Sequence, residues 1–246
     1  MIGLRTLLRR FRQPTPSVSR PTTGPMAVRD RYEDIRDVLQ LPAPTIVDGG
    51  ANTGTVTDLF LRQYQNPTIH AFEPRPDAAD VMREKYRHRE NVRVHQNALG
   101  ARAETRTFNV VGRPTSSSFL APSAVNRTYH PDLMHVERHI EVSVVRLDRV
   151  LECDLDLVKL DLQGYELEAL RGCEELLPRI KVITTEVEFV PLYETQPLFA
   201  DIDLFLRAHG FRLLNLYELW TQEDGQLTAG DAVYLNERHF SALRRS

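Results

Sequence analysis

The stretch of sequence that decides the fold reads Thr45-Ile46-Val47-Asp48-Gly49-Gly50-Ala51-Asn52-Thr53-Gly54. An apolar, β-branched run ends in an acid and then breaks into a glycine-rich turn. A helical pattern follows over residues 55–64. A strand, a tight glycine turn and a helix form the unit that holds a nucleotide in doubly wound α/β proteins. The question this raises is whether the turn holds a dinucleotide or another adenosine-bearing cofactor.

Strand and helix patterns alternate from about residue 27 onward, which predicts a mostly parallel sheet with helices on both faces. The predicted strands cover residues 46–49, 68–72, 92–96, 155–160, 182–186, 211–216 and 232–235, with extra strands at 105–111 and 141–147. The predicted helices cover residues 28–39, 55–64, 77–86, 167–177 and 199–208. A turn signal, Glu223-Asp224-Gly225, separates the last two strands, so we expect an antiparallel final strand in a hairpin at one sheet edge.

The composition is that of an ordinary globular domain. The chain has 246 residues, of which 41% are hydrophobic and 26% charged, and we assign residues 27–246 to one domain. A net charge of −3 gives no general case for nucleic-acid binding. No apolar run approaches the roughly 18 residues that a membrane-spanning helix needs.

The N-terminus differs from the rest of the chain. Six arginines and no acid precede Asp30, and residues 1–26 read as a basic, Pro/Ser-rich and flexible tail. A short amphipathic helix over residues 1–11 that touches a membrane surface or a partner is the alternative. We expect Cys153 and Cys173 to be buried thiols in a reducing compartment, which favours a cytoplasmic location.

Polar residues stand at the carboxyl ends of the first three predicted strands, on one edge of the sheet. In a nicotinamide-binding turn the glycines are spaced Gly-x-Gly-x-x-Gly, whereas Asn52 here stands where the second close-approach glycine is expected. Asp48 ends the first strand, Glu73 the second and Asn97 the third. A carboxylate in the place of Glu73 can accept both ribose hydroxyls. The alternative is that these residues only cap helices or pair with neighbours such as Arg75.

Four segments together resemble the FkbM family of S-adenosylmethionine-dependent methyltransferases. They are Asp48-Gly-Gly-Ala-Asn52-Thr-Gly54, Ala71-Phe72-Glu73-Pro74, Asn97-Ala98-Leu99-Gly100 and Lys159-Leu160-Asp161-Leu162-Gln163-Gly164-Tyr165-Glu166. The resemblance covers residues 44 to about 217. Gln163 departs from the family pattern, in which a glutamate is more usual.

The resemblance implies a Rossmann-like class I methyltransferase fold with strand order 3-2-1-4-5-7-6, an antiparallel last strand and helices on both faces. It also implies S-adenosylmethionine as cofactor, S-adenosylhomocysteine as product, and a small-molecule or glycan acceptor. The cofactor contacts predicted on these motifs are Asp48, Gly49, Gly50, Ala51, Asn52, Gly54, Glu73, Pro74, Asn97, Ala98 and Asp161.

Methyl transfer to an alkyl hydroxyl needs a proton acceptor beside the reacting oxygen. Asp161, which ends the fourth core strand, is our first candidate, with Glu186 on the fifth strand as the second. A helix-capping role for Asp161 and an arginine-pairing role for Glu186 are the alternatives. Ser117, Gln163, Glu188 and Tyr193 are the predicted substrate contacts. We expect no metal, because Gln163 is a poor third ligand beside two carboxylates.

Three functions are consistent with these features. The first is O-methylation of a hydroxyl on a sugar, glycan or secondary metabolite. The second is methylation of nitrogen or a carboxylate on the same fold. The third is a nicotinamide-dependent oxidoreductase or a non-catalytic adenosine-binding protein, which the missing Gly-x-Gly-x-x-Gly pattern disfavours.

Overall fold

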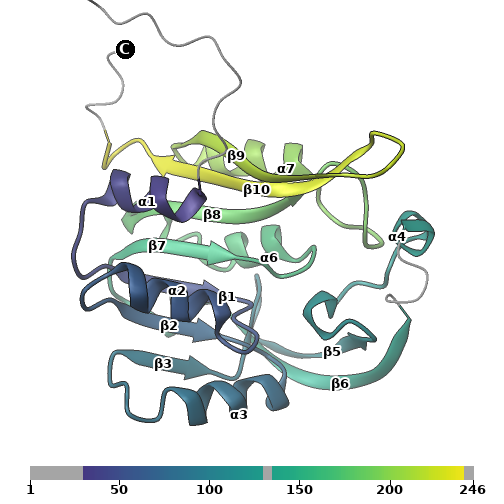
Figure 1. The fold of residues 1–246 in the computed structure, drawn as a ribbon, viewed down its shortest axis with the longest axis horizontal. Helices are drawn as coiled ribbons and strands as arrows, with labels where there is room; N and C mark the ends of the chain where they lie inside the picture. The colour runs from purple at the N-terminus through teal and green to yellow at the C-terminus, as the bar shows by residue number, and fades with distance from the viewer. Residues whose placement is uncertain (1–29, 130–134, 241–246) are drawn as a thin grey trace, which may run out of the picture.

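A seven-stranded sheet forms the centre of the fold (Figure 1). The computed structural model describes residues 30–129 and 135–240. Along the chain, the central strands are β1 (Thr45–Gly49), β2 (Thr68–Phe72), β3 (Val92–His95), β7 (Leu155–Leu160), β8 (Ile180–Glu188), β9 (Phe211–Thr221) and β10 (Leu227–Asn236). They lie in the order β3-β2-β1-β7-β8-β10-β9, which reads 3-2-1-4-5-7-6 when these strands alone are numbered. β10 is antiparallel to both neighbours. The predicted fold class and antiparallel last strand are confirmed.

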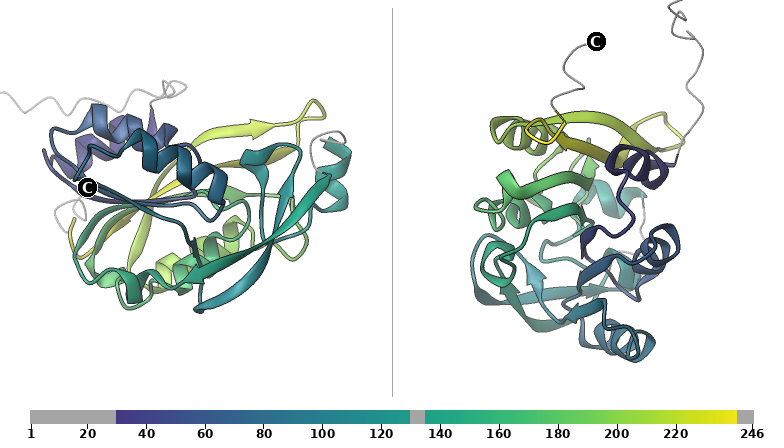
Figure 2. Two further views of the ribbon diagram at one scale, coloured as in Figure 1. Left: turned by 90° about the horizontal axis from the view of Figure 1, so that it is seen from below. Right: turned by 90° about the vertical axis from the view of Figure 1, so that its left-hand side faces the viewer.

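Helices cover both faces of this sheet, as Figure 2 shows. One face carries α1 (Arg31–Leu39), α2 (Thr55–Gln63) and α3 (Pro76–Lys85), and the other carries α5 (Leu147–Val150), α6 (Glu166–Arg171), the short η2 (Leu177–Arg179) and α7 (Phe199–Ala208). The strands supply both cores alternately, so that Ile46 packs in one core and Val47 in the other. Successive strand side chains point to opposite faces, which is why a strand buried on both faces needs a continuous apolar run.

A second, three-stranded sheet is inserted between β3 and β7. It consists of β4 (Ala98–Leu99), β5 (Glu104–Val111) and β6 (Val136–Val145), in the order β4-β6-β5. The short η1 (Pro114–Ser116) and α4 (Ala124–Tyr129) follow β5. Figure 1 places this sheet toward the end of the central sheet at which the parallel arrows point. The two extra strands were predicted from the sequence, but their union into a separate sheet was not.

Two helix boundaries differ from the sequence prediction. The helix expected over residues 167–177 ends at Arg171, and Gly172 is its C-cap, where a Cβ would lie 2.0 Å from the Gly100 carbonyl oxygen. The first helix begins at Arg31, because the Asp30 carboxylate accepts hydrogen bonds from the amides of Tyr32 and Glu33 at 2.8 and 3.1 Å. Such a cap fixes the start of a helix.

The two cysteines differ in exposure. Cys173 is buried, but Cys153 is exposed, so the prediction of two buried thiols was wrong for Cys153. No helix among residues 30–129 and 135–240 is long and apolar enough to cross a bilayer. The predicted tail, residues 1–26, lies outside the described residues.

Candidate active site

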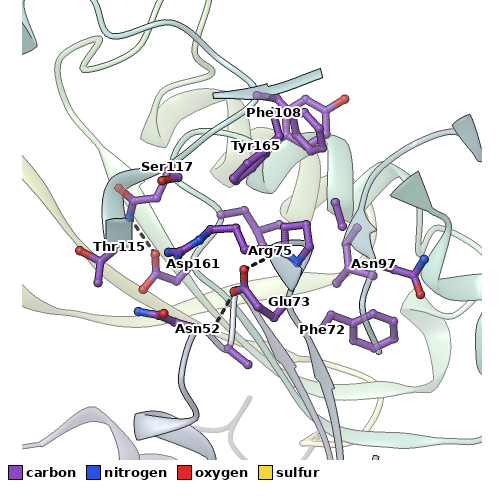
Figure 3. Close-up of a pocket in the computed structure, with 18 of the residues that line it drawn as sticks. Asn52, Phe72, Glu73, Arg75, Asn97, Phe108, Thr115, Ser117, Asp161 and Tyr165 are labelled. Carbon is purple, nitrogen blue, oxygen red and sulfur yellow. Dashed lines mark hydrogen bonds between the residues drawn. The ribbon is translucent and has the colours of Figure 1, made fainter. Parts of the chain in front are cut away.

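A cavity of about 270 Å³ opens at the carboxyl ends of β1, β2 and β7, where β4 and β5 of the second sheet close one side. Figure 3 shows Asn52, Glu73, Asn97 and Asp161 around it. Of the predicted site residues, ten line this one cavity: Gly50, Ala51, Asn52, Glu73, Pro74, Asn97, Ala98, Ser117, Asp161 and Gln163. The topology therefore gathers residues that are more than a hundred positions apart in the sequence.

The turn after β1 is held mainly by backbone hydrogen bonds. The amides of Gly50 and Ala51 both donate to the Phe72 carbonyl at 3.0 Å. Gly50 has φ +71°, and a Cβ there would lie 1.9 Å from the Asp161 carbonyl oxygen. The glycine therefore allows the turn to pass directly over the end of β7. Asn52 also has a positive φ of 50°, a conformation that asparagine tolerates better than most residues.

Glu73 links this turn to the end of β2. Its Oε2 accepts from the Asn52 amide and its Oε1 from the Arg75 amide, both at 2.9 Å (Figure 3). The side chain is nearly buried, and burial raises the pKa of Glu73 despite these bonds. Each carboxylate oxygen can accept more than one hydrogen bond, so oxygens fixed in this way can still receive hydroxyl donors from the cavity. The guanidinium of Arg75 pairs with Asp77 at 2.6 Å.

Three residues predicted to contact the cofactor lie behind the cavity wall. Asp48 is fully buried, where Oδ2 accepts from Thr57 at 2.7 Å and Oδ1 lies 3.2 Å from the Lys159 ammonium. The Gly49 carbonyl oxygen accepts a hydrogen bond from the same ammonium at 3.0 Å. Gly54 makes room for a ring, because a Cβ there would lie 2.4 Å from the Tyr86 hydroxyl. These three residues support the turn from behind instead of lining the cavity.

Lys159 is the buried cation beneath the turn, and it was quoted only as part of a motif in the sequence analysis. Its ammonium also contacts the Gly50 carbonyl at 3.2 Å and lies 3.9 Å from Asp161 Oδ2. Burial alone would lower the pKa of Lys159, but attraction to Asp48 and Asp161 raises it above its usual range. A lysine this strongly paired is a fixed positive charge under the turn.

At the end of β7, Asp161 and Gln163 connect the cavity to Glu186 on β8. The Gln163 amide nitrogen donates to Asp161 Oδ1 at 2.9 Å and to Glu186 Oε2 at 2.8 Å. The Tyr193 hydroxyl lies 2.9 Å from Gln163 Oε1. Asp161 and Gln163 line the cavity, whereas Glu186 and Tyr193 lie one layer behind them. Tyr193, a predicted substrate contact, therefore does not line the cavity itself but contacts Gln163, which does.

Two further acids are buried behind this layer. Glu166 accepts from the Leu162 amide at 2.6 Å, and burial raises the pKa of Glu166 to about 7. Glu188 is 1% exposed, and its Oε2 has no hydrogen-bond partner among the described residues. Burial, followed by the nearby Glu166, raises the pKa of Glu188 well above its usual range. Glu188 does not line the cavity, and its substrate contact stays a prediction.

The sequence analysis missed the aromatic wall of the cavity. Phe108 on β5, Phe119 in the following loop and Tyr165 before α6 lie in edge or tilted contact, with ring centroids 5.1 and 4.7 Å apart. Arg106 donates to the Tyr165 hydroxyl at 2.8 Å. Phe72 lines the cavity from the central sheet, stacked on His95 at 4.4 Å. The apolar alternation of β5 was the available signal, but it did not show that β5 faces the site.

Ser117 and Ser118 lie beside the cavity and Gln163. Ser117 lines the cavity, and its oxygen accepts from the Val111 amide at 3.3 Å. The hydroxyl of Ser118 donates to the backbone oxygen of Gln163 at 2.7 Å. Among the described residues, no group of three or more His, Cys, Asp or Glu side chains is arranged to hold a metal ion.

Comparisons with known proteins agree with this geometry. A family model described as the methyltransferase FkbM domain matches residues 48–213. The chain is 29% identical over 217 residues to the 2-O-methyltransferase NoeI of Sinorhizobium fredii, covering 83% of this chain and 85% of that protein. It is 28% identical to the 31-O-demethyl-FK506 methyltransferase FkbM of Streptomyces tacrolimicus, covering 70% of this chain and 74% of that one.

A solved structure shares the fold at lower identity. The crystal structure of methyltransferase FkbM from Methylobacillus flagellatus superposes with a TM-score of 0.52 at 14% identity. The match covers 79% of this chain but only 44% of that chain. It supports the fold.

Proposed function

The chain belongs to the FkbM methyltransferase family, and we propose that it transfers a methyl group from S-adenosylmethionine to a hydroxyl oxygen of a sugar, a glycan or a secondary metabolite. The observation that carries this proposal is the single cavity lined by Asn52, Glu73, Asn97 and Asp161. One relative named above is called a 2-O-methyltransferase and the other a 31-O-demethyl-FK506 methyltransferase, and both names support oxygen as the acceptor atom.

The residues of the cavity fit an extended adenosine ligand. Glu73 is held with both oxygens at the cavity wall, as ribose hydroxyls require. Asn97, Ala98 and the ring of Phe72 offer a polar edge and apolar surface for a base. Thr55 and Val56 line the cavity at the start of α2, where a helix N-terminus favours the carboxylate of an amino acid moiety.

Asp161 is the residue we assign as the proton acceptor. S-adenosylmethionine, when bound, supplies a methyl group on a positively charged sulfur. The chain has to hold the acceptor hydroxyl about 3–3.5 Å from that carbon and in line with the bond that breaks. Asp161 lines the cavity with a side chain that is 42% exposed, so its carboxylate can reach a proton from an acceptor. Glu186, behind Gln163, supports Asp161 instead of meeting the acceptor.

Two loops pack against each other next to Gln163. The Ser123 amide donates to the Leu192 carbonyl at 3.0 Å, and the Glu194 amide donates to the Ala121 carbonyl at 2.8 Å. The Ser123 hydroxyl adds a bond to the Pro191 oxygen at 2.6 Å. We propose that residues 112–129 and 189–198 select the acceptor, because these contacts fix one loop against the other beside Gln163.

Calorimetry with S-adenosylhomocysteine and with NAD tests the cofactor. We expect S-adenosylhomocysteine to bind and NAD not to bind, and the reverse result would overturn the proposal. A screen of hydroxylated acceptors with a labelled methyl donor then tests the reaction. Labelling only of amines or carboxylates would reject the assignment to oxygen.

We also propose a cytoplasmic location. Both cysteines are free thiols, as is usual in a reducing compartment. Cell fractionation tests this proposal, and recovery of the protein outside the cytoplasm would contradict it.

A further inference from the structure

The Gln163 amide joins two carboxylates that come from different strands. Its nitrogen lies 2.9 Å from Asp161 Oδ1 and 2.8 Å from Glu186 Oε2. A primary amide has two hydrogens on nitrogen, so one is available for each carboxylate. Both donors of Gln163 are therefore used, and the two acids are held on either side of one nitrogen atom.

The rest of Gln163 is fixed as well. Its φ of +55° places the residue in the left-handed region, and its backbone oxygen accepts from the Ser118 hydroxyl at 2.7 Å. The Tyr193 hydroxyl lies 2.9 Å from Gln163 Oε1 and 2.9 Å from the Ser116 carbonyl. These contacts turn the carbonyl of the amide toward Tyr193 and the nitrogen toward the acids. The orientation of Gln163 is thus set by three separate segments.

The charges around the pair are mostly negative. Glu188 on the same strand and Glu166 on α6 are acids near enough to interact electrostatically with Glu186. The Tyr193 hydroxyl faces the same group of acids. On the neighbouring strand β10, Asp231 is the register partner of Glu186 and forms an ion pair with Arg31 of α1. On the other side, Lys159 lies 3.9 Å from Asp161 and 3.2 Å from Asp48. Burial, followed by Asp161, Glu188 and Glu166, raises the pKa of Glu186 well above its usual range.

We propose that Gln163 is a positioning residue that clamps Asp161 and Glu186 into a carboxyl pair sharing one proton, with Asp161 presenting a free oxygen to the acceptor. The proposal rests on the proposed methyl transfer. The resting proton lies on Glu186, which is the more buried of the two acids. The ammonium of Lys159, of opposite charge, lies 3.9 Å from Asp161 Oδ2.

The acceptor oxygen forms a bond to the methyl carbon as the carbon–sulfur bond breaks, and sulfur keeps the electron pair. The hydroxyl proton passes to Asp161, so the pair changes from one proton to two and from a charge of −1 to neutral. A proton then leaves the pair for solvent through the exposed side of Asp161.

A glutamate at position 163 would have the same shape but no hydrogens to donate. It would place a third carboxylate between the other two and replace two hydrogen bonds with repulsion. Like charges in one site raise the pH at which the last proton leaves. Gln163→Glu should therefore bind protons more tightly when folded than the parent does, and it should lose stability as the pH rises.

The first test needs no acceptor. The melting temperatures of the parent and of Gln163→Glu are compared from pH 5.5 to pH 8.5, with the exposed Gln65→Glu as a control for the same chemical change. We expect the deficit of Gln163→Glu to grow by about 3 °C or more across this range, and that of Gln65→Glu to stay constant. A deficit for Gln163→Glu that is the same at every pH would overturn the proposal.

A charge-conserving exchange protects the test against a variant that fails to fold. Gln163→Glu combined with Glu186→Gln restores one amide and two carboxyls to the cluster. We expect the double variant to recover most of the stability that Gln163→Glu loses at pH 8.5. If the double variant is as unstable as the single one, the two side chains do not interact as proposed.

The second test separates this inference from the proposed function. Binding of S-adenosylhomocysteine to Gln163→Glu should stay within about threefold of the parent, because Glu73 and the turn are unchanged. With an acceptor found by the screen, the acid limb of kcat should move up by about one pH unit. An unmoved limb would reject the pair while leaving the methyltransferase function intact, whereas a parent protein that does not bind S-adenosylhomocysteine would reject that function.

Discussion

The two halves of the cavity are built in different ways. On the side of β1 and β2, short runs of neighbouring residues hold the wall, chiefly through backbone amides that donate to Phe72 and Glu73. On the side of β7 and β8, side chains from separate segments meet at Gln163. The first half follows from a motif, while the second depends on how distant segments pack. The first is therefore suited to a constant ligand, and the second is free to change with the acceptor.

The largest effect is expected where the two halves touch. Gly50→Ala would place a Cβ 1.9 Å from the Asp161 carbonyl, at a φ of +71°. Because backbone has to move on both sides, we expect a loss of about 5 kcal/mol or more in the free energy of unfolding. Gly225→Ala is the matched control, since it has φ +85° but nothing within 4 Å, and it should cost only about 1–2 kcal/mol. Urea denaturation measures both, and equal losses would mean that the contact with Asp161 does not matter.

The next effect should separate chemistry from cofactor binding. Asp161→Asn keeps the shape of the side chain but removes the proposed proton acceptor. Turnover should fall about 10²–10⁴-fold, with S-adenosylhomocysteine affinity nearly unchanged in calorimetry. Unchanged turnover would show that another group, or solvent, takes the proton.

The first half of the site is tested through Glu73. Glu73→Ala removes an acceptor that is proposed to bind ribose, and it should weaken S-adenosylhomocysteine binding by about 1.5–3 kcal/mol, as for hydrogen bonds to a charged group. Asp77→Ala is the control, because it alters the exposed partner of Arg75 without touching the cavity. It should change affinity by less than about 1 kcal/mol. Similar losses in both variants would point to a general loosening of the loop.

The smallest effect concerns pH. The pKa of Glu166 is raised from 4.5 to about 7 when folded, so the folded state holds its proton more tightly than the unfolded state does. That stability is fully present below pH 4.5 and is lost as the pH rises through 7. Glu166→Gln should flatten this loss by about 1–2 kcal/mol, since coupled acids share the change. Denaturation at pH 5 and pH 8 measures it, and an unchanged slope would rule Glu166 out as its source.

The sequence predicted the central sheet well, because strands such as β1 are apolar on both faces and end in recognisable turns. It also predicted ten of the residues that line the cavity, most of them at or just after the carboxyl ends of β1, β2 and β7. It did not predict that Asp48 turns inward to Lys159, since a carboxylate at a strand end can face either way. The wall made by Phe108 and Phe119 was missed because it depends on where the second sheet docks. Local sequence patterns are enough to predict the strands, whereas the side of the cavity around Gln163 depends on contacts between distant segments.

The packing of Tyr86 against Gly54 links the residues that can be accepted at these two positions. The Tyr86 hydroxyl lies 2.9 Å from the Gly54 carbonyl oxygen and 2.7 Å from Asp58 Oδ1. In a related protein, a residue larger than glycine at position 54 would require a residue smaller than tyrosine at position 86. The two positions, 32 residues apart, should therefore vary together among relatives. Gly54 resembles part of a cofactor-binding motif, but the space that Tyr86 occupies would be the reason to keep it.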